Sequence, residues 1–434
     1  MPSLDYGSIS QAMIKSILLV LMVSFTFALT AQYEELRMED YVYVTNIKSA
    51  HISPLGNTLE PAITYLGNGV VLQLSFDDMD ADQKDFTYDI IHCDRNWMPS
   101  KELAKQEYIE GFVNEEVDNW RFSTGTFIPY TNYTLNIPNR DVSLLLSGNY
   151  VIVVYDGEED EDRIPVLTRR FVVVDRKVNV IAESRRPMDV SKIDSHQEFN
   201  LTVEHKDFSI IDPMINLTVS INQNGNWNYA IENIVPRIAL GEKIIVDNTG
   251  IISFPALNEF RSLDIRSFDI VSNDIQALEL TDNGTNILVK LGEPRINDAY
   301  STYPDADGAF IIDTRDNNYA ATQSDYGNVI FSLDMPEVSE DVYVLGKFTD
   351  WQVDEMYKMY YDNNREIYLA QIELKQGFYD YMFAVDNGGF LDPTPIEGSS
   401  YKAQNFYSAF VYLREPGDRY DRLIGYAKLA PGLF

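Results

Sequence analysis

The feature that most constrains this chain is a succession of short β-rich runs, bounded by Gly, Pro, Asn and Asp, with no long stretch of helical periodicity. Runs of this length and alternation are typical of half-buried strands. Because no helices alternate with these strands, the chain offers no doubly wound parallel sheet on which a nucleotide site could be built. We therefore predict an all-β fold of tandem β-sandwich domains.

The runs fall into three series, which predict three sandwiches over residues 32–175, 176–300 and 301–416 and a C-terminal tail at 417–434. The stretch 291–307 is rich in Pro, Asp and Tyr and is interpreted as a linker into the third sandwich. Strands are expected at 70–76, 86–93, 133–137, 149–155 and 170–174 in the first domain. They are expected at 178–181, 198–204, 217–222, 244–246, 263–270, 277–280 and 287–291 in the second, and at 329–333, 342–345, 368–374, 379–385 and 406–413 in the third.

Residues 1–31 have the pattern of a secretory signal peptide. An apolar run at 17–29 follows Lys15 and ends among small residues, as in a cleaved leader. The run is shorter than the roughly 20 apolar residues of a membrane span, and a membrane anchor is the alternative interpretation. Met13 is an alternative start, and the exported chain is predicted to begin near Gln32.

Composition narrows the range of partners. The formal net charge of −33 argues against nucleic acid and anionic membrane surfaces, because both require basic patches. The acidic clusters at 77–80 and 158–162 are predicted to be solvated loops. The single cysteine, Cys93, has no intrachain disulfide partner and is predicted to be a buried thiol. Its neighbour His92 would point to the opposite face of a strand, which disfavours a joint metal site.

The residues for catalysis are few. Only four histidines are present, and His196 and His205 are too far apart on an extended strand to share a metal ion. No G-x-S-x-G elbow and no phosphate-binding glycine loop occur. The Asp-Ala-Asp-Gly string at 305–308 lacks the rest of a calcium loop. We predict no enzyme, no cofactor and no metal site.

The stretch 86–112 is unusual for a sandwich. It begins with the alternation of a strand, leaves it near Asp94 and reaches Pro99, where a regular ladder must stop. A helix after this point would be short and marginal on its own. The large side chains of this excursion either fold back on their own sheet or face a partner, because a loop this long in a compact domain is usually functional. We predict a partner interface that includes Trp97, Met98, Tyr108 and Phe112.

Several long strings give the chain a family resemblance. They are LQLSFDD at 72–78, IIHCDRNWMPS at 90–100, QEYIEGF at 106–112, YTNYTLNIPN at 130–139, SGNYVIVVYD at 147–156 and RRFVVV at 169–174. These strings resemble the first domain of the plug protein of the bacterial type IX secretion system. LKQGFYDYMF at 374–383 and PGDRYDRLIG at 416–425 are similar to the same family. The resemblance covers most of the chain after the leader, although the middle third carries no string of its own.

This resemblance implies a non-enzymatic periplasmic component of type IX secretion. Such a protein binds the periplasmic mouth of the outer-membrane translocon barrel and closes its pore while no cargo carrier is docked. The implied state is a monomer bound to the translocon. No C-terminal sorting domain is evident after Phe410, which favours a component of the machinery over secreted cargo.

A second resemblance concerns the third sandwich. VYVLGKFTDW at 342–351 and LKQGFYDYMFAVDNGGF at 374–390 resemble immunoglobulin-like, early-set glycogen-binding modules. The family pattern implies a structural role for Trp351. Phe390 stands where the family has its sugar-stacking Trp, and Met382 where it has a Lys, so we predict no binding of α-glucans. A periplasmic carbohydrate-binding accessory protein is the alternative function.

Overall fold

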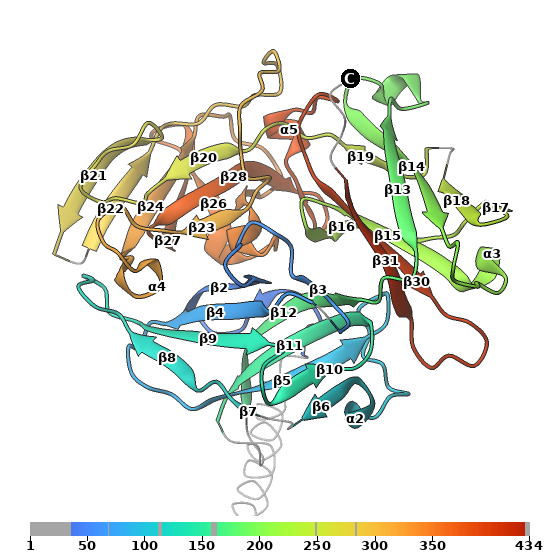
Figure 1. The fold of residues 1–434 in the computed structure, drawn as a ribbon. Coiled ribbons are helices and arrows are strands. Elements are labelled where there is room, and N and C mark those ends of the chain that lie inside the picture. Colours follow the sequence, from blue (N-terminus) through green and yellow to red (C-terminus); the bar gives the residue numbers. More distant parts are fainter. Residues whose placement is uncertain are drawn as a thin grey trace, which may run out of the picture. The chain divides into compact units, whose positions relative to one another are not determined.

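The structure is a computed structural model that describes residues 36–67, 69–111, 115–157, 163–247, 250–282 and 284–429. Contacts divide the chain into two units, Met1–Arg37 and Met38–Phe434, and all the described strands and cores belong to the second unit. The predicted all-β fold is confirmed, since strands in several sheets make up most of its regular structure (Figure 1). No helix within the described residues has both the length and the apolar character needed to cross a membrane.

Two sheets enclose the first core. One has the order β1 (Tyr41–Val42), β12 (Ile164–Val174), β11 (Gly148–Asp156), β5 (Phe86–Cys93), β7 (Glu115–Glu116), with β3 (Ile63–Tyr65) beside β12. The other has the order β2 (Ile47–Pro54), β4 (Leu72–Asp78), β9 (Thr131–Ile137), β8 (Asn119–Phe122). The helical turn α2 (Lys105–Tyr108) leads into β6 (Ile109–Gly111), which pairs with β10 (Val142–Leu144).

The first core forms because both sheets turn an aromatic and β-branched face inward. Phe76 of β4 stacks on Tyr133 of β9 with ring centroids 5.2 Å apart, and Tyr150 of β11 stacks on Phe171 of β12 at 5.3 Å. Stacked and edge-on aromatic pairs add to the free energy gained by burying apolar area. Eight of the nine residues of β11 are buried, in agreement with the apolar run at 150–155 within it.

Two further sheets enclose the second core. One has the order β13 (Asn179–Arg185), β14 (His196–Glu204), β18 (Lys243–Asp247), β17 (Ile238–Leu240), with β19 (Ser253–Pro255) beside β14. The other has the order β16 (Asn226–Ile234), β15 (Leu217–Gln223), β30 (Tyr407–Leu413), β31 (Arg422–Leu429). Figure 1 shows the two red C-terminal strands lying beside the green strands of the middle of the chain. The 3-10 helix η1 (Val190–Lys192) and the turn α3 (Pro213–Asn216) lie in the connections.

The strands around the third core all belong to one connected sheet of ten strands. Its order is β20 (Arg261–Asp264), β28 (Gly377–Asp386), β25 (Val342–Leu345), β26 (Lys358–Asp362), β27 (Ile367–Lys375), β24 (Tyr326–Leu333), β22 (Gly284–Val289), β21 (Ile275–Thr281). Two short strands, β23 (Phe310–Ile312) and β29 (Leu391–Asp392), also pair with β28. The connections contain α4 (Ala320–Gln323), η2 (Lys347–Thr349), η3 (Glu355–Tyr357) and α5 (Thr394–Glu397).

The strand pairing crosses the expected boundary between the second and third sandwiches in both directions. β30 was expected in the third sandwich, but it pairs with β15 along residues 217–223 and 407–413. The strands β20, β21 and β22 were expected in the second sandwich, but β20 pairs with β28 and β22 pairs in parallel with β24. The expected assignment of these strands to sandwiches is therefore wrong. Apolar runs show that a strand forms, whereas its partner depends on contacts distant in sequence. The domain boundaries themselves stay predictions.

Candidate interaction site

The excursion after β5 begins with a tight polar loop. The Asp94 carboxylate accepts hydrogen bonds from the backbone N–H groups of Asn96 and Met98, both at 2.9 Å, and the Asp94 N–H donates to the Met98 carbonyl at 2.8 Å. This closure places Trp97 in the left-handed region with φ of 63°. A bulky residue rarely adopts that conformation unless its surroundings hold it there.

Trp97 is held by contacts within the chain. Its ring meets Trp227 of β16 edge to face, with centroids 5.0 Å apart, and the Arg170 guanidinium lies 4.5 Å from the ring centroid. Only 3 % of the Trp97 surface is exposed. The indole therefore anchors the first pair of sheets on the sheet that contains β16, a role consistent with the energy of buried aromatic and cation–π pairs.

Polar contacts extend the same anchor. The Asp421 carboxylate, itself 2 % exposed, accepts from the Arg95 backbone N–H at 3.0 Å and from the Arg95 guanidinium at 2.9 Å. The Asn233 side chain accepts from Arg95 Nε at 2.8 Å and donates to the Asn96 side chain at 2.9 Å. Nothing in the sequence indicated that Asp421 is buried, because it stands among three other charged residues, Asp418, Arg419 and Arg422.

The other predicted interface residues have different environments. Tyr108 is 8 % exposed and packs in the first core near His92, with ring centroids 5.6 Å apart. Met98 is 58 % exposed. Phe112 lies outside the described residues. The structure thus brings Trp97 and Tyr108 into contacts within the chain and leaves Met98 at the surface, and the role of the four residues in a partner interface stays a prediction.

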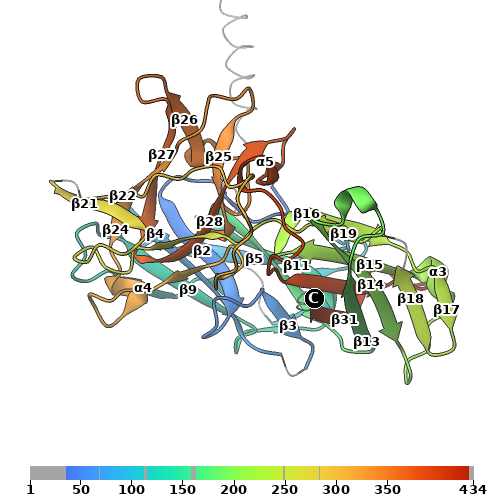
Figure 2. The ribbon, with the colours of Figure 1, turned by 90° about the horizontal axis from the view of Figure 1, so that it is seen from above.

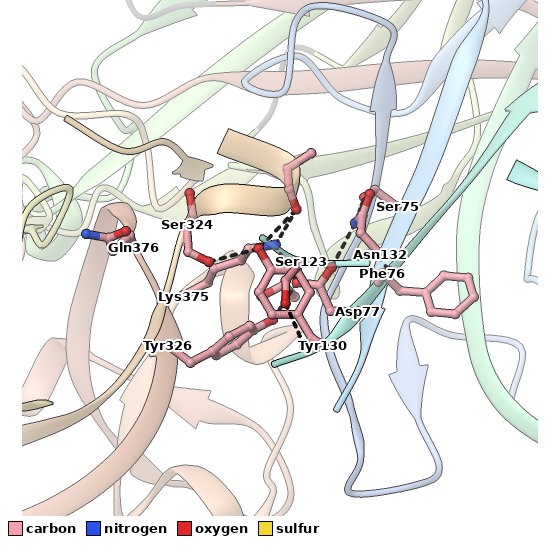
Figure 3. A network of polar contacts seen from close by, with 12 residues as sticks. Ser75, Phe76, Asp77, Ser123, Tyr130, Asn132, Ser324, Tyr326, Lys375 and Gln376 are labelled. Atoms are coloured by element: carbon pink, nitrogen blue, oxygen red, sulfur yellow. Dashed lines mark hydrogen bonds and ion pairs between the residues drawn. The ribbon is translucent and has the colours of Figure 1, made fainter. Parts of the chain in front are cut away.

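A second joint is a buried ion pair between the first and third cores. Lys375 at the end of β27 donates to the Asp77 carboxylate of β4 at 2.6 Å, and both side chains are at most 2 % exposed (Figure 3). Burial lowers the pKa of Lys375, and the Asp77 carboxylate opposes that shift. The ammonium also donates to the Ala321 carbonyl at 2.8 Å and lies 4.0 Å from the Tyr130 ring centroid.

Further hydrogen bonds complete the environment of Asp77. Its carboxylate accepts from the Tyr326 hydroxyl at 2.6 Å and from the Asn132 amide at 2.7 Å. The Tyr130 hydroxyl donates to the Ser324 carbonyl at 2.8 Å, which links the residue before β9 to the residue after α4 (Figure 3). A buried ion pair is tolerated when its remaining polar atoms are satisfied in this way. The joint therefore fixes β4 and β9 against β24 and β27.

The acidic cluster at 77–80 was expected to be a solvated loop, and this expectation is wrong for two of its residues. Asp77 and Asp78 end β4, and each is at most 1 % exposed. Asp78 forms an ion pair with Lys84 at 2.9 Å. A run of acidic residues in the sequence does not show whether its carboxylates are solvated or are buried beside cations. Here the cations are Lys375 for Asp77 and Lys84 for Asp78. The second cluster, at 158–162, lies outside the described residues.

A third joint forms around Arg169 of β12. Its guanidinium forms an ion pair with Asp350 at 3.1 Å and donates to the Ala50 carbonyl at 2.9 Å. It also donates to the Tyr41 carbonyl at 3.2 Å. The Arg169 side chain is 4 % exposed. Arginine suits this position because its planar fork can serve several oxygens at once.

The thiol of Cys93 and the grouping of acidic and histidine side chains decide whether the described residues could bind a metal ion. Cys93 is buried, as predicted, and burial raises the pKa of its thiol to about 12. A thiol in this state is a poor nucleophile and a poor metal ligand. Across the described ranges, no three His, Cys, Asp or Glu side chains are grouped so that they could hold a metal ion.

Met382 and Phe390, which stand where the glycogen-binding modules have their sugar-binding residues, both contact other side chains of this chain. Met382 is fully buried in a cluster with Phe260, Tyr343 and Trp351. Phe390 packs on Tyr229 of β16 with ring centroids 5.9 Å apart. Met382 is therefore closed off from solvent, whereas Phe390 is half-buried, and the absence of α-glucan binding stays a prediction.

These sheets and joints define the class: an all-β protein of several sheets whose cores are tied together by buried polar and aromatic contacts. Residues 47–175 match the family model described as Type 9 secretion system plug protein 1st domain, and this match supports the type IX secretion plug family for the chain. Among curated proteins, none matches the chain.

One solved structure is similar over nearly the whole chain. It is the crystal structure of a hypothetical protein from Parabacteroides merdae, with 29 % sequence identity and a TM-score of 0.87. The similarity covers 91 % of this chain and 100 % of that one. The arrangement of strands described above is therefore similar to one observed in a crystal.

Proposed function

We propose that this chain is a non-enzymatic, periplasmic component of the type IX secretion system. It binds the periplasmic mouth of the outer-membrane translocon barrel and closes the pore while no cargo carrier is docked. The observation that carries the proposal is the match of residues 47–175 to the first domain of the plug family. Export by the leader at 1–31 is part of the same proposal.

The joints supply a physical basis for this role. A plug must keep its shape against a pore many residues wide, so its parts must not rotate freely. The pairing of Trp97 with Trp227, the buried pair of Lys375 and Asp77, and the ion pair of Arg169 and Asp350 each link two cores. An arrangement that separated the partners of these buried pairs would leave an uncompensated charge, which is strongly destabilising.

We further propose that the excursion 94–112 contributes to the contact with the translocon. Trp97 and Tyr108 are buried within the chain, so direct contact in the described part of this segment runs through Met98, which is 58 % exposed. Exposed apolar side chains on ordered loops are typical anchors of protein interfaces.

Affinity purification of the tagged chain from native cell envelopes tests the proposal. The translocon barrel should co-purify with the wild-type chain, and Met98→Asp should reduce its yield at an unchanged melting temperature. Met188→Asp is the matched control, because Met188 is 65 % exposed and lies in a different core region. Failure of the barrel to co-purify with the wild-type chain would refute the function, whereas equal recovery with Met98→Asp would refute only the contact at Met98.

A further inference from the structure

The strand β21 forms an outer edge of the ten-stranded sheet. In the part of the chain that the structure describes, β21 pairs with β22 and with no second strand. Figure 2 shows β21 at the periphery, and Figure 1 shows β22 between it and β24. A one-residue irregularity lies between Ile275 and Ala277, and the register is regular from 277 to 281. Among the described residues, no strand lies on the outer side of residues 277–280, which leaves backbone groups there for a partner strand.

The side chains along this edge are apolar or acidic. Leu280 on the strand is 82 % exposed, and Ile270 and Val271 in the preceding loop are 61 % and 52 % exposed. Asp269, Glu279 and Asp282 are exposed as well. The segment 267–289 contains four acidic residues and neither Lys nor Arg. Edge strands are commonly protected by charged side chains, especially lysine, by proline or by bulges. β21 has neither lysine nor proline; its protecting features are the acidic Glu279 and the irregularity between Ile275 and Ala277, which leaves 277–280 regular.

We infer that the β21 edge is a docking site for an extended, basic segment of a partner protein. The backbone of such a segment would add a strand antiparallel or parallel to β21, and its main-chain hydrogen bonds would supply affinity. Lysine or arginine side chains would lie against Glu279 and Asp282, while apolar side chains would cover Leu280. The acidic segment 267–289 favours a basic partner, because opposite charges attract and raise the association rate.

A second copy of this chain is a poor occupant of the same edge. Two β21 strands placed side by side would bring two acidic segments without Lys or Arg next to each other, and like charges on neighbouring strands destabilise the pair. The overall charge of −33 adds repulsion between copies. The edge is thus biased against self-association and toward a partner of opposite charge.

The proposed function assigns no role to the β21 edge, and the inference rests on that function only for the identity of the natural partner. A synthetic probe separates the two. The probe is a short capped peptide that alternates lysine with valine, compared with a peptide that alternates glutamate with valine and with a lysine peptide whose valines are replaced by proline. Proline removes the backbone N–H groups that a strand must donate.

The experiment measures binding of each peptide to the full chain, together with hydrogen exchange of the backbone amides. The lysine–valine peptide should bind and protect amides of β21, and Glu279→Lys should weaken it by about tenfold or more. Glu242→Lys is the matched control, because Glu242 is exposed in the turn beside another edge strand, β17. This control should leave binding within about twofold of the wild-type value.

Three results would overturn the inference. The first is absence of binding by the lysine–valine peptide. The second is equal weakening by Glu279→Lys and Glu242→Lys, which would mean that overall charge alone attracts the peptide. The third is a dimer of the free chain with protected β21 amides, which would assign the edge to a second copy. None of these results bears on recovery of the translocon barrel, so failure here and failure of the proposed function remain distinguishable.

Discussion

At the scale of single residues, the structure separates two side chains that are adjacent in the sequence. Trp97 is 3 % exposed and packed between Trp227 and Arg170, whereas Met98 is 58 % exposed. The sequence indicated that large side chains gather on the excursion 94–112. The structure shows that the buried Trp97 is followed directly by the exposed Met98. Their separation depends on the loop closed by Asp94, which no apolar pattern reveals.

Trp97→Ala should lower the free energy of unfolding by about 3–5 kcal/mol, because truncation of a buried Trp loses apolar contacts and leaves a cavity. Met98→Ala should change it by less than about 0.5 kcal/mol, as expected for a surface substitution. Urea unfolding of the two variants checks both values. An unchanged stability for Trp97→Ala would mean that the indole is not packed as described.

Asp380 of β28 gives a prediction for pH. Its side chain is fully buried and accepts hydrogen bonds from the backbone N–H groups of Ala306 and Gly308. Burial raises the pKa of Asp380 to about 7, and the nearby carboxylates of Asp305 and Asp307 add to the shift. The folded state therefore holds the proton more tightly than the unfolded chain, whose ordinary value is 3.8.

The sign follows from this difference. The contribution of Asp380 is fully present below its unfolded pKa of 3.8 and is lost as the pH rises through about 7. Asp380→Asn keeps an acceptor for the two N–H groups and removes the ionisation. Urea unfolding at pH 5.5 and pH 8.5, two values chosen on either side of about 7, should show a smaller loss of stability for the variant than for the wild type. Equal losses would contradict the account.

At the scale of elements, many of the longer strands were predictable, but β2, β16 and β31 were not expected, and the partners of the strands were not predictable. The apolar alternation of β4 and β27 is visible in the sequence, as is the buried run of β11. Nothing local indicates that β4 and β27 contribute the two halves of one ion pair, since Asp77 and Lys375 are 298 residues apart. The same limit explains why β30 was assigned to the third sandwich rather than beside β15.

Lys375→Met should destabilise the chain by about 3–5 kcal/mol, because it leaves the Asp77 carboxylate buried without its cation. The double variant Asp77→Asn/Lys375→Met should recover much of that loss, since no uncompensated charge remains. Thermal or urea unfolding of the single and double variants provides the measurement. A double variant no more stable than Lys375→Met would show that the pair does not act as a unit.

At the scale of the whole molecule, the first core is built from one continuous stretch of the chain, whereas the second core combines two separate stretches. Both sheets of the first core draw all their strands from residues 41–174. The second core is completed by β30 and β31, which follow the whole of the third core in sequence. Chain order alone could not show this, because the middle of the sequence reads as a series of strands that could close on itself.

Fragments of the chain should reflect this difference. A fragment of residues 38–175 should unfold cooperatively, because its two sheets are complete. A fragment of residues 176–300 should not, because β15 would lose β30 and expose a central strand. Circular dichroism with urea titration distinguishes the two outcomes. Cooperative unfolding of the 176–300 fragment would show that the middle region closes without the C-terminal strands.

The most direct measurement of the proposed function is the conductance of the purified translocon barrel in a planar bilayer, before and after addition of the full chain. The account predicts an open pore that closes when the chain is added on the periplasmic side and stays open when it is added on the other side. An open pore under both additions, with the chain folded and in excess, would contradict the plug function.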